Sequence, residues 1–290
     1  MRFPVKLNRT AWPAQLTQIL PSAVDPRILC HGPVDETRFT SAVSTFKFGS
    51  TFKSTQKARF PLTILELTRL EFSTPPVILD IGASDGSTSL DLMQALPFEK
   101  YYVTDLNIEV YYEVSGPVTW FYAENGTPLL RVSDRWVVYP DIGGAIFPFN
   151  LLSQALFRQA PKFSSDIAKI LLINPSLLER KDSRVEIQKH NLFDPWPAEK
   201  ADLILAANIL NQGYFTNSEI GLALKKLLTA LKDSGRLAIV DNRPGEKASL
   251  FRFQNGQMQL EKQINGGTDI EALALQTFAS LPPAVPTEQG

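Results

Sequence analysis

Cysteine and histidine are scarce in this 290-residue sequence, which has one cysteine, Cys30, and two histidines, His31 and His190. A single cysteine excludes an intrachain disulfide and is typical of a reducing compartment, so the sequence predicts a cytoplasmic protein. So few thiol and imidazole ligands leave little for a zinc or iron centre, and we expect no metal site.

Charge of one sign and long apolar runs are also lacking. A net charge of −1 gives no general attraction to nucleic acid or to an anionic membrane. No apolar run reaches the length of a transmembrane helix, and the first residues lack the continuous apolar segment of a secretory signal. We therefore expect no nucleic-acid partner and no stable membrane insertion. A hydrophobic content of 44% is ample for a folded core.

The chain is organised around one apolar run and the glycine loop after it. Residues 77–81, Val-Ile-Leu-Asp-Ile, indicate a buried parallel strand. Gly82 and Gly86 follow in a loop, and residues 87–93 have the pattern of a helix. The spacing is neither the G-x-G-x-x-G of a dinucleotide site nor that of a phosphate-binding loop. A strand, a glycine turn and a helix in this order let a ligand approach the backbone closely.

Four further segments predict strands of the same sheet. Residues 101–105 end in Asp105, about 20 residues beyond the glycine loop, where a doubly wound fold places the carboxylate that binds ribose hydroxyls. A helix is predicted over residues 219–231, and a final hairpin turns at Asn255-Gly256. The other three predicted strands are residues 184–190, 201–208 and 236–241.

Asp80 at the strand end, with Gly82 and Gly86 after it, resembles motif I of the class I S-adenosylmethionine (SAM) methyltransferases. The resemblance covers about residues 70–245 and implies SAM as cofactor and S-adenosyl-L-homocysteine (SAH) as its product. In that family the glycine backbone touches the methionine part of SAM, and the acidic residue orients its amino group. The cofactor-binding residues that the resemblance implies are Asp80, Gly82, Ala83, Ser84, Gly86, Asp105, Leu106, Asn191, Leu192, Phe193, Asp194 and Asn208.

Residues 184–240 also have a partial resemblance to chemotaxis-receptor glutamate O-methyltransferases. Those proteins carry an arginine before the strand-end asparagine, whereas Ala207 precedes Asn208 here. Their basic receptor-docking helix is not found either. The substrate of that subfamily is therefore not carried over, and methylation of a protein carboxyl group stays as an alternative.

Pattern and resemblance together predict an α/β fold with a doubly wound, mostly parallel seven-stranded sheet, the Rossmann-like methyltransferase fold. A β-hairpin and helix insert is expected after the second strand. We expect an N-terminal arm with helices on the substrate side over residues 1–70, and a SAM-binding core over residues 71–110 and 180–281. The insert would span residues 111–179, and a flexible tail residues 282–290.

The insert has several interpretations. Residues 118–122 and 129–132 flank an Asn-Gly turn and predict a hairpin, and residues 146–163 predict a helix. It is a lid or substrate subdomain, a homodimer interface, or an amphipathic surface that touches lipid. As a lid, its many aromatic side chains suit an apolar or aromatic acceptor, unless they form the insert's own core. Residues 45–53, rich in phenylalanine and lysine, either grip a substrate or form a surface hairpin.

These observations predict a SAM-dependent methyltransferase that acts on a small, apolar or aromatic molecule by in-line displacement, with O- or N-methylation. No catalytic triad is found, and none is needed, because positioning the acceptor does much of the catalysis. The candidate catalytic residues are His190, Tyr214 and His31. A SAM-binding regulatory or scaffold protein without turnover is the alternative from another class.

Overall fold

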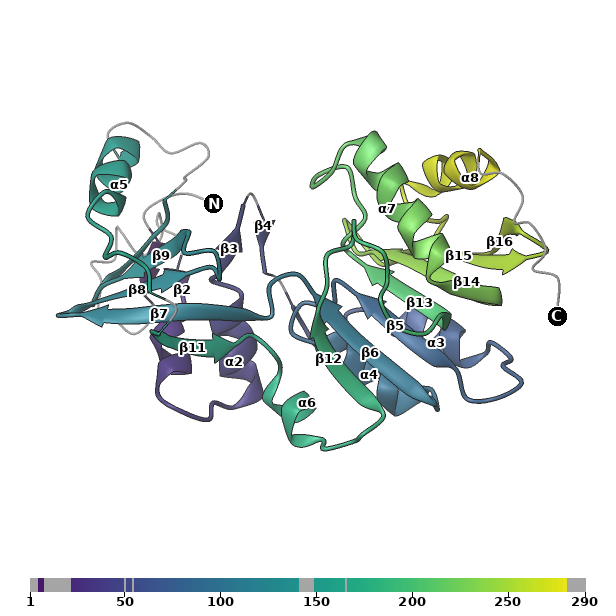
Figure 1. The fold of residues 1–290 in the computed structure, drawn as a ribbon, viewed down its shortest axis with the longest axis horizontal. Helices are drawn as coiled ribbons and strands as arrows, with labels where there is room; N and C mark the ends of the chain where they lie inside the picture. The colour runs from purple at the N-terminus through teal and green to yellow at the C-terminus, as the bar shows by residue number, and fades with distance from the viewer. Residues whose placement is uncertain are drawn as a thin grey trace. The chain divides into compact units, whose positions relative to one another are not determined.

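The computed structural model describes residues 5–7, 22–49, 51–53, 55–140, 149–164 and 166–280. The chain divides into two compact units, each built from two segments of sequence (Figure 1). Unit 1 comprises Met1–Thr55 and Asn107–Arg180, and unit 2 comprises Gln56–Leu106 and Lys181–Gly290. The sequence predicted the divisions after residues 70, 110 and 179 instead. The predicted tail over residues 282–290 lies outside the described residues.

Unit 2 contains the mostly parallel seven-stranded sheet that the sequence predicts. The strand order is β12-β6-β5-β13-β14-β15-β16. The first five strands in this order are parallel, and β15 and β16 continue the sheet antiparallel. The strands are β5 (Val77–Ile81), β6 (Lys100–Asp105), β12 (Val185–Lys189), β13 (Ala201–Ala207), β14 (Leu231–Asp241), β15 (Lys247–Gln254) and β16 (Gln257–Ile264).

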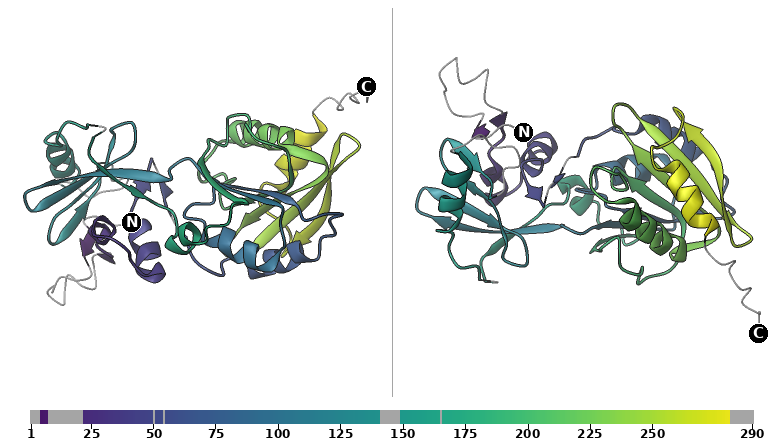
Figure 2. Two further views of the ribbon diagram at one scale, coloured as in Figure 1. Left: turned by 60° about the horizontal axis from the view of Figure 1, so that its bottom comes forward. Right: turned by 90° about the horizontal axis from the view of Figure 1, so that it is seen from above.

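Helices cover both faces of this sheet, which explains why all five residues of β5 are buried. Figures 1 and 2 show α3 and α4 on one face and α7 and α8 on the other. Apolar side chains of β5, β13 and β14 pack against α7 and α8 in one core that includes Leu79, Ile204, Leu224 and Phe278. The helices are α3 (Pro61–Thr68), α4 (Ser87–Ala95), α7 (Asn217–Thr229) and α8 (Glu271–Ala279).

Local sequence signals set the ends of two elements in unit 2. The Thr216 hydroxyl accepts a hydrogen bond from the Glu219 backbone, and the Glu219 carboxylate accepts one from the Thr216 backbone, which makes a capping box at the start of α7. Asn255 and Gly256 have φ of 53° and 74° between β15 and β16. Both residues are left-handed, as a two-residue hairpin turn requires, and the predicted hairpin is confirmed there.

Unit 1 is built on a second, mixed sheet with the order β11-β7-β8-β9-β10-β1-β2. Its N-terminal strand β1 pairs with β10, so Val5 lies opposite Val137. A two-stranded hairpin, β3 with β4, belongs to the same unit. The sheet strands are β1 (Val5–Leu7), β2 (Ser22–Ala23), β7 (Glu109–Ser115), β8 (Val118–Tyr122), β9 (Pro128–Val132), β10 (Trp136–Val138) and β11 (Ala168–Leu171), and the hairpin is β3 (Lys47–Phe48) and β4 (Thr51–Phe52).

Several aromatic side chains among the described residues of unit 1 pack in its own core. Phe121 is fully buried and meets Phe46 edge to face, with ring centroids 5.3 Å apart. Trp120 is 5% exposed and meets Phe157 of α5 at 5.4 Å. Trp120 and Phe121 are thus explained by packing within the unit, the alternative to an acceptor-binding surface that the sequence left open. The helices of unit 1 are η1 (Pro26–Cys30), α2 (Glu36–Val43), α5 (Phe149–Phe157) and α6 (Pro175–Glu179).

Candidate functional site

The loops after β5 and β13 meet at the topological switch point of the unit 2 sheet. From β5 the chain proceeds to β6 on one side, and it later returns to place β13 on the other side. Ligands of open α/β sheets bind outside the carboxyl ends of the strands at such a point. Ser84 and Asn208 follow these two strands with φ of 60° and 57°. Left-handed residues other than glycine concentrate at functional sites, so both mark this edge as a candidate site.

The glycine loop after β5 is held by two hydrogen bonds to the end of β6. The Ala83 N–H donates to the Thr104 carbonyl, 2.8 Å away. The Ser84 N–H donates to Asp105 Oδ2 at 2.9 Å. Gly86 has φ of 83° and is the N-cap of α4, where a left-handed backbone favours glycine. The loop is thus fixed to the end of β6 before any ligand arrives.

Asp85, which sequence reasoning passed over, closes the loop onto α4. Its side chain is fully buried, and its carboxylate accepts hydrogen bonds from the N–H and the hydroxyl of Ser87 at 2.9 and 3.0 Å. A carboxylate at a helix N-terminus stabilises the unpaired N–H groups there. The spacing of an acidic residue two positions before the first helical residue was the available signal for this role.

Asp80 lies beneath the loop rather than at its surface. It is 1% exposed, and Asp80 Oδ2 accepts hydrogen bonds from Ser89 Oγ at 2.6 Å and from the Tyr101 hydroxyl at 3.2 Å. Burial raises the pKa of this carboxyl group to about 6, although the two hydroxyl donors oppose the shift. Asp80 therefore carries a negative charge at neutral pH in a poorly solvated position.

Gly82 is required by packing as well as by its backbone. Its φ is 69°, and a Cβ added there would overlap Cδ1 of Ile209. Ile209 follows β13, so this contact joins the loops after the two adjacent strands. Packing against Ile209 is thus enough to explain the glycine at position 82. The polar groups of the two loops, and not Gly82, point to a ligand.

Two of those polar groups lack partners. Ser84 Oγ and Asn208 Nδ2 are buried, and neither has a hydrogen-bond partner among the described residues. Asn208 Oδ1, in contrast, accepts the N–H of Asn242 at 3.1 Å. Buried polar atoms are nearly always satisfied, so a donor and an acceptor left over at one sheet edge fit a polar ligand such as SAM.

The predicted adenine-binding segment after β12 divides into different environments. Leu192 is 6% exposed and belongs to the core of unit 2. The Asn191 carbonyl oxygen Oδ1 accepts the Phe193 N–H in a local turn at 3.2 Å. Asp194 is exposed, and so is Leu106 after β6, at 48%.

Phe193 contacts Phe215 edge to face, with ring centroids 5.3 Å apart. The two residues follow β12 and β13, which are separated in the sheet by β6 and β5. Three strand spacings amount to roughly 14 Å. The aromatic pair therefore joins two loops across the carboxyl ends of the intervening strands.

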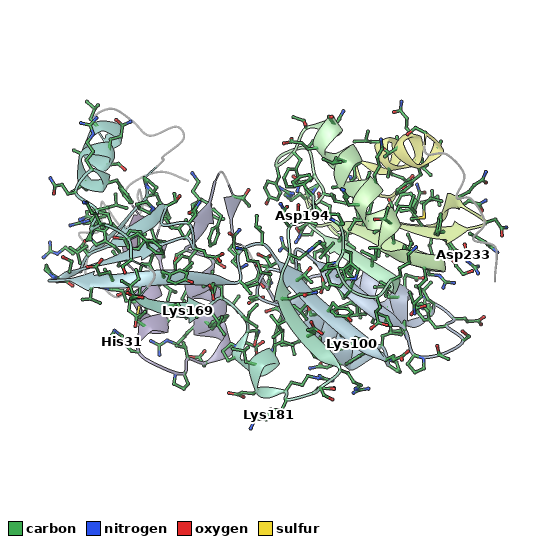
Figure 3. The ribbon with its side chains drawn as sticks, in the orientation of Figure 1. His31, Lys100, Lys169, Lys181, Asp194 and Asp233 are labelled. Atoms are coloured by element: carbon green, nitrogen blue, oxygen red, sulfur yellow. The ribbon has the colours of Figure 1, made fainter. Side chains whose placement is uncertain are left out.

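The three candidate catalytic residues belong to two different units. His190 directly follows β12, and its ring meets Trp196 edge to face at 5.2 Å. Burial lowers the pKa of His190, with Asp194 opposing, so the imidazole is neutral at pH 7. Tyr214, 37% exposed, lies in the loop after β13 of the same unit. His31 is an exposed residue of unit 1 (Figure 3).

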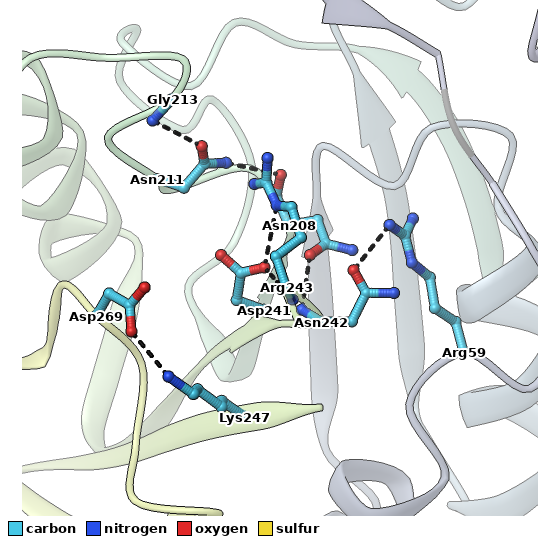
Figure 4. A network of polar contacts seen from close by, with 9 residues as sticks. All are labelled: Arg59, Asn208, Asn211, Gly213, Asp241, Asn242, Arg243, Lys247 and Asp269. Atoms are coloured by element: carbon cyan, nitrogen blue, oxygen red, sulfur yellow. Dashed lines mark hydrogen bonds and ion pairs between the residues drawn. The ribbon is translucent and has the colours of Figure 1, made fainter. Parts of the chain in front are cut away.

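A polar network that the sequence did not predict surrounds the end of β14 (Figure 4). Asp241 Oδ1 accepts hydrogen bonds from the backbone and Nε of Arg243 at 3.1 and 3.3 Å. Arg59 donates to Asn242 Oδ1 at 3.0 Å, and burial lowers its pKa. The only sequence signal for this network was the run of polar residues that follows the predicted strand over residues 236–241. Arg59 thus belongs to this network.

A cavity of about 250 Å³ opens beside this network. Three segments line it: the loop after β13, the end of β14 and the residues before α8. The lining residues are Leu210, Asn211, Gln212, Gly213, Asp241, Arg243, Thr268, Asp269 and Ile270. It lies at the carboxyl edge of the sheet, the edge that also carries Ser84 and Asn208.

No family model matches the chain. A curated relative, O-methyltransferase aoiF of Aspergillus oryzae, is 27% identical over an alignment of 173 residues, and the match covers 50% of this chain and 40% of that protein. The chain thus spans less than half the length of this relative.

Solved structures that resemble the chain include N-methyltransferase NodS from Bradyrhizobium japonicum in complex with SAH, at 14% identity and a TM-score of 0.33, with 64% of this chain and 63% of that chain covered. Human N-acetylserotonin methyltransferase in complex with SAM is 13% identical with a TM-score of 0.32, covering 62% and 34%. The similar proteins are methyltransferases. The fold of unit 2 is established by its own sheet order.

Among the described residues, no three histidine, cysteine, aspartate or glutamate side chains come together as metal ligands. The helices of the described ranges are all too short or too polar to cross a bilayer.

Proposed function

We propose that this protein is a SAM-dependent methyltransferase whose cofactor site is the carboxyl edge of the unit 2 sheet. The observation that carries the proposal is the pair of buried, unpartnered polar atoms, Ser84 Oγ and Asn208 Nδ2, at the switch point beside the glycine loop. A nucleoside with a charged aminocarboxylate tail offers donors and acceptors of the right kind for both. The likeness to methyltransferases supports the same assignment at the level of the fold.

The chain's own residues would divide the work of binding. Asp105, at the end of β6, would accept hydrogen bonds from ribose hydroxyls while it holds the loop through Ser84. Asp80 would place negative charge beneath the loop, opposite the cofactor's ammonium group. Phe193 and Leu106 would supply apolar surface for adenine, with Asn191 or Asp194 as its polar neighbour.

Bound there, SAM would supply an electrophilic methyl group, which passes to an acceptor lone pair while the carbon–sulfur electron pair stays on sulfur and leaves SAH. The protein's task is then to hold the acceptor in line and to exclude water. A neutral His190 could take a proton from a hydroxyl or amine acceptor, whereas a carboxylate needs no base. The roles of His190, Tyr214 and His31, and of residues 111–179 in acceptor binding, stay predictions.

Calorimetric titration with SAH tests the proposal. We expect one SAH to bind per chain, and NAD to give no heat. Asn208→Gly removes the unpartnered Nδ2, together with the Oδ1 that accepts the Asn242 N–H, without straining the left-handed backbone. Loss of the ligand contact from Nδ2 should weaken SAH binding about fivefold, the equivalent of one neutral hydrogen bond of about 1 kcal/mol.

Asn255→Gly is the matched control, since Asn255 is also left-handed but turns the exposed β15–β16 hairpin. It should leave the affinity within about twofold, because it removes no predicted ligand contact. The proposal fails if SAH does not bind, or if Asn208→Gly binds it as well as the unchanged protein does.

A further inference from the structure

The 250 Å³ cavity beside β14 offers charged groups of both signs that the chain itself leaves partly unused. Asp241 Oδ1 is taken by Arg243, but Asp241 Oδ2 accepts no hydrogen bond among the described residues. The Asp241 side chain is 16% exposed. An ionised carboxylate accepts up to about four hydrogen bonds, so a half-buried one with a free oxygen suits an additional donor.

Asp269 lines the same cavity but is more open to solvent, with 70% of its side chain exposed. Its Oδ1 accepts a hydrogen bond from Lys247 at 3.0 Å, and its Oδ2 has no partner among the described residues. Figure 4 shows the second oxygens of Asp241 and Asp269 turned toward the space between the two side chains. That space therefore suits a cationic donor, an ammonium group above all.

Arg243 supplies the opposite charge. Its Nε is used by Asp241, and its guanidinium plane lies 5.1 Å from the ring centroid of Tyr214. The terminal Nη atoms make no hydrogen bond with the described part of the chain, and Nη1 lies close to Gly213 on the cavity wall. A guanidinium with two free nitrogens binds a carboxylate through paired hydrogen bonds.

From these contacts we propose that the cavity binds a small zwitterion, with its ammonium group at Asp241 and Asp269 and its carboxylate at Arg243. The volume limits the ligand, since sites for drug-sized molecules begin near about 300 Å³. Only Leu210 and Ile270 among the lining residues are apolar, so a wholly apolar ligand is disfavoured. This inference rests on the proposed function, because the zwitterion bound in the cavity would be the methyl acceptor.

Four small probes separate the parts of the site in ligand-observed NMR titrations of the full chain: 4-aminobutyrate, n-butylamine, butyrate and phenol. We expect 4-aminobutyrate to bind at least about tenfold more tightly than either half-molecule, because both charged contacts form together. Phenol should bind more weakly than 4-aminobutyrate. Equal affinity for n-butylamine or butyrate, or tighter binding of phenol, overturns the proposal.

Three variants locate the probe. Asp241→Asn keeps an acceptor for Arg243 but removes the charge, and Arg243→Gln removes the guanidinium. Each should weaken 4-aminobutyrate binding about tenfold or more, as expected for a charge-assisted hydrogen bond. Asp233→Asn, at an exposed acid elsewhere on unit 2, should leave binding unchanged. Unchanged binding in both cavity variants overturns the proposal.

The titration is repeated with saturating SAH, since an amino acid could also enter a site for the methionine part of SAM. We expect SAH not to displace 4-aminobutyrate, and displacement contradicts the proposal. If SAH binds and the probe does not, the zwitterion site is wrong while the cofactor site stands. If the probe binds at the cavity and SAH does not bind at all, the proposed function fails instead.

Discussion

The backbone N–H of Ser84 donates a hydrogen bond to the carboxylate of Asp105, with the two atoms 2.9 Å apart. Asp105 therefore fixes the glycine loop in addition to any contact with a ligand. The two roles can be separated because asparagine still offers an oxygen to Ser84 but carries no charge. Alanine offers neither.

Asp105→Asn should keep the loop in place and weaken SAH binding, whereas Asp105→Ala should also destabilise unit 2. Loss of a charged hydrogen bond of about 1.5–3 kcal/mol predicts about a tenfold or greater fall in SAH affinity for both variants. Calorimetry measures the affinity, and urea unfolding measures stability. An unchanged affinity in Asp105→Asn would mean that the charge of Asp105 plays no part in binding.

Asp80 makes the stability of unit 2 depend on pH. Its folded-state pKa is raised from 3.8 to about 6 by burial, so the folded chain holds this proton to a higher pH than the unfolded chain does. The contribution of Asp80 to the free energy of unfolding therefore falls as pH rises from about 4 to 6, and it stays lower above pH 6. A shift of about two pKa units corresponds to about 3 kcal/mol.

Asp80→Asn should remove this dependence, since the amide is neutral at every pH. Its unfolding free energy in urea, relative to the unchanged protein, should rise between pH 4 and pH 6 and reach on the order of 2–3 kcal/mol at pH 7. The asparagine oxygen can still accept from Ser89. A difference between the two proteins that does not vary with pH would show that Asp80 is not buried as a charge.

Gly82 and Ile209 should be coupled in stability. Gly82→Ala introduces a Cβ that overlaps Ile209 Cδ1 and also places alanine in a left-handed conformation, which costs about 1–2 kcal/mol. Adding Ile209→Ala removes the overlap but not the backbone strain. In a double-mutant cycle the pair should therefore be less destabilised than the sum of the single changes, and simple additivity would contradict the observed packing.

Unit 2 should fold and bind SAH without unit 1. Residues 56–106 joined to residues 181–280 retain every strand of the parallel sheet. The linker must cross from the end of β6 to the start of the parallel strand β12, which takes about 12 residues. We expect SAH affinity within about tenfold of the full chain, the equivalent of about 1.4 kcal/mol. A folded fragment, by circular dichroism, that loses SAH binding would place part of the cofactor site in unit 1.

Much of unit 2 was predictable because its signals are local. Buried parallel strands such as β5 are continuous apolar runs, and the Asn255-Gly256 pair specifies its hairpin without long-range information. The glycine loop and Asp105 follow from spacing along the chain. These features predicted the sheet and the edge at which the polar loops gather.

The rest depends on contacts between distant residues. Nothing in the sequence of β1, β2 and α2 indicates that these elements share one sheet and one core with β7 to β11. Lys53, interpreted as a substrate-gripping or surface residue, is buried and donates to the Asn107 carbonyl at 2.8 Å. Likewise the Asp241–Arg243 network and the Gly82–Ile209 contact arise from loops that meet only after the sheet has formed.

The pairing of Val5 with Val137 also has a consequence for synthesis on the ribosome. Strand β1 emerges early, but its partner strand β10 follows only after more than a hundred further residues. At about 5–20 residues per second, β1 waits on the order of 10 s for that partner. Unit 1 therefore cannot be completed vectorially from its N-terminus, and its first strand stays an open template for other pairing until translation has passed Val138.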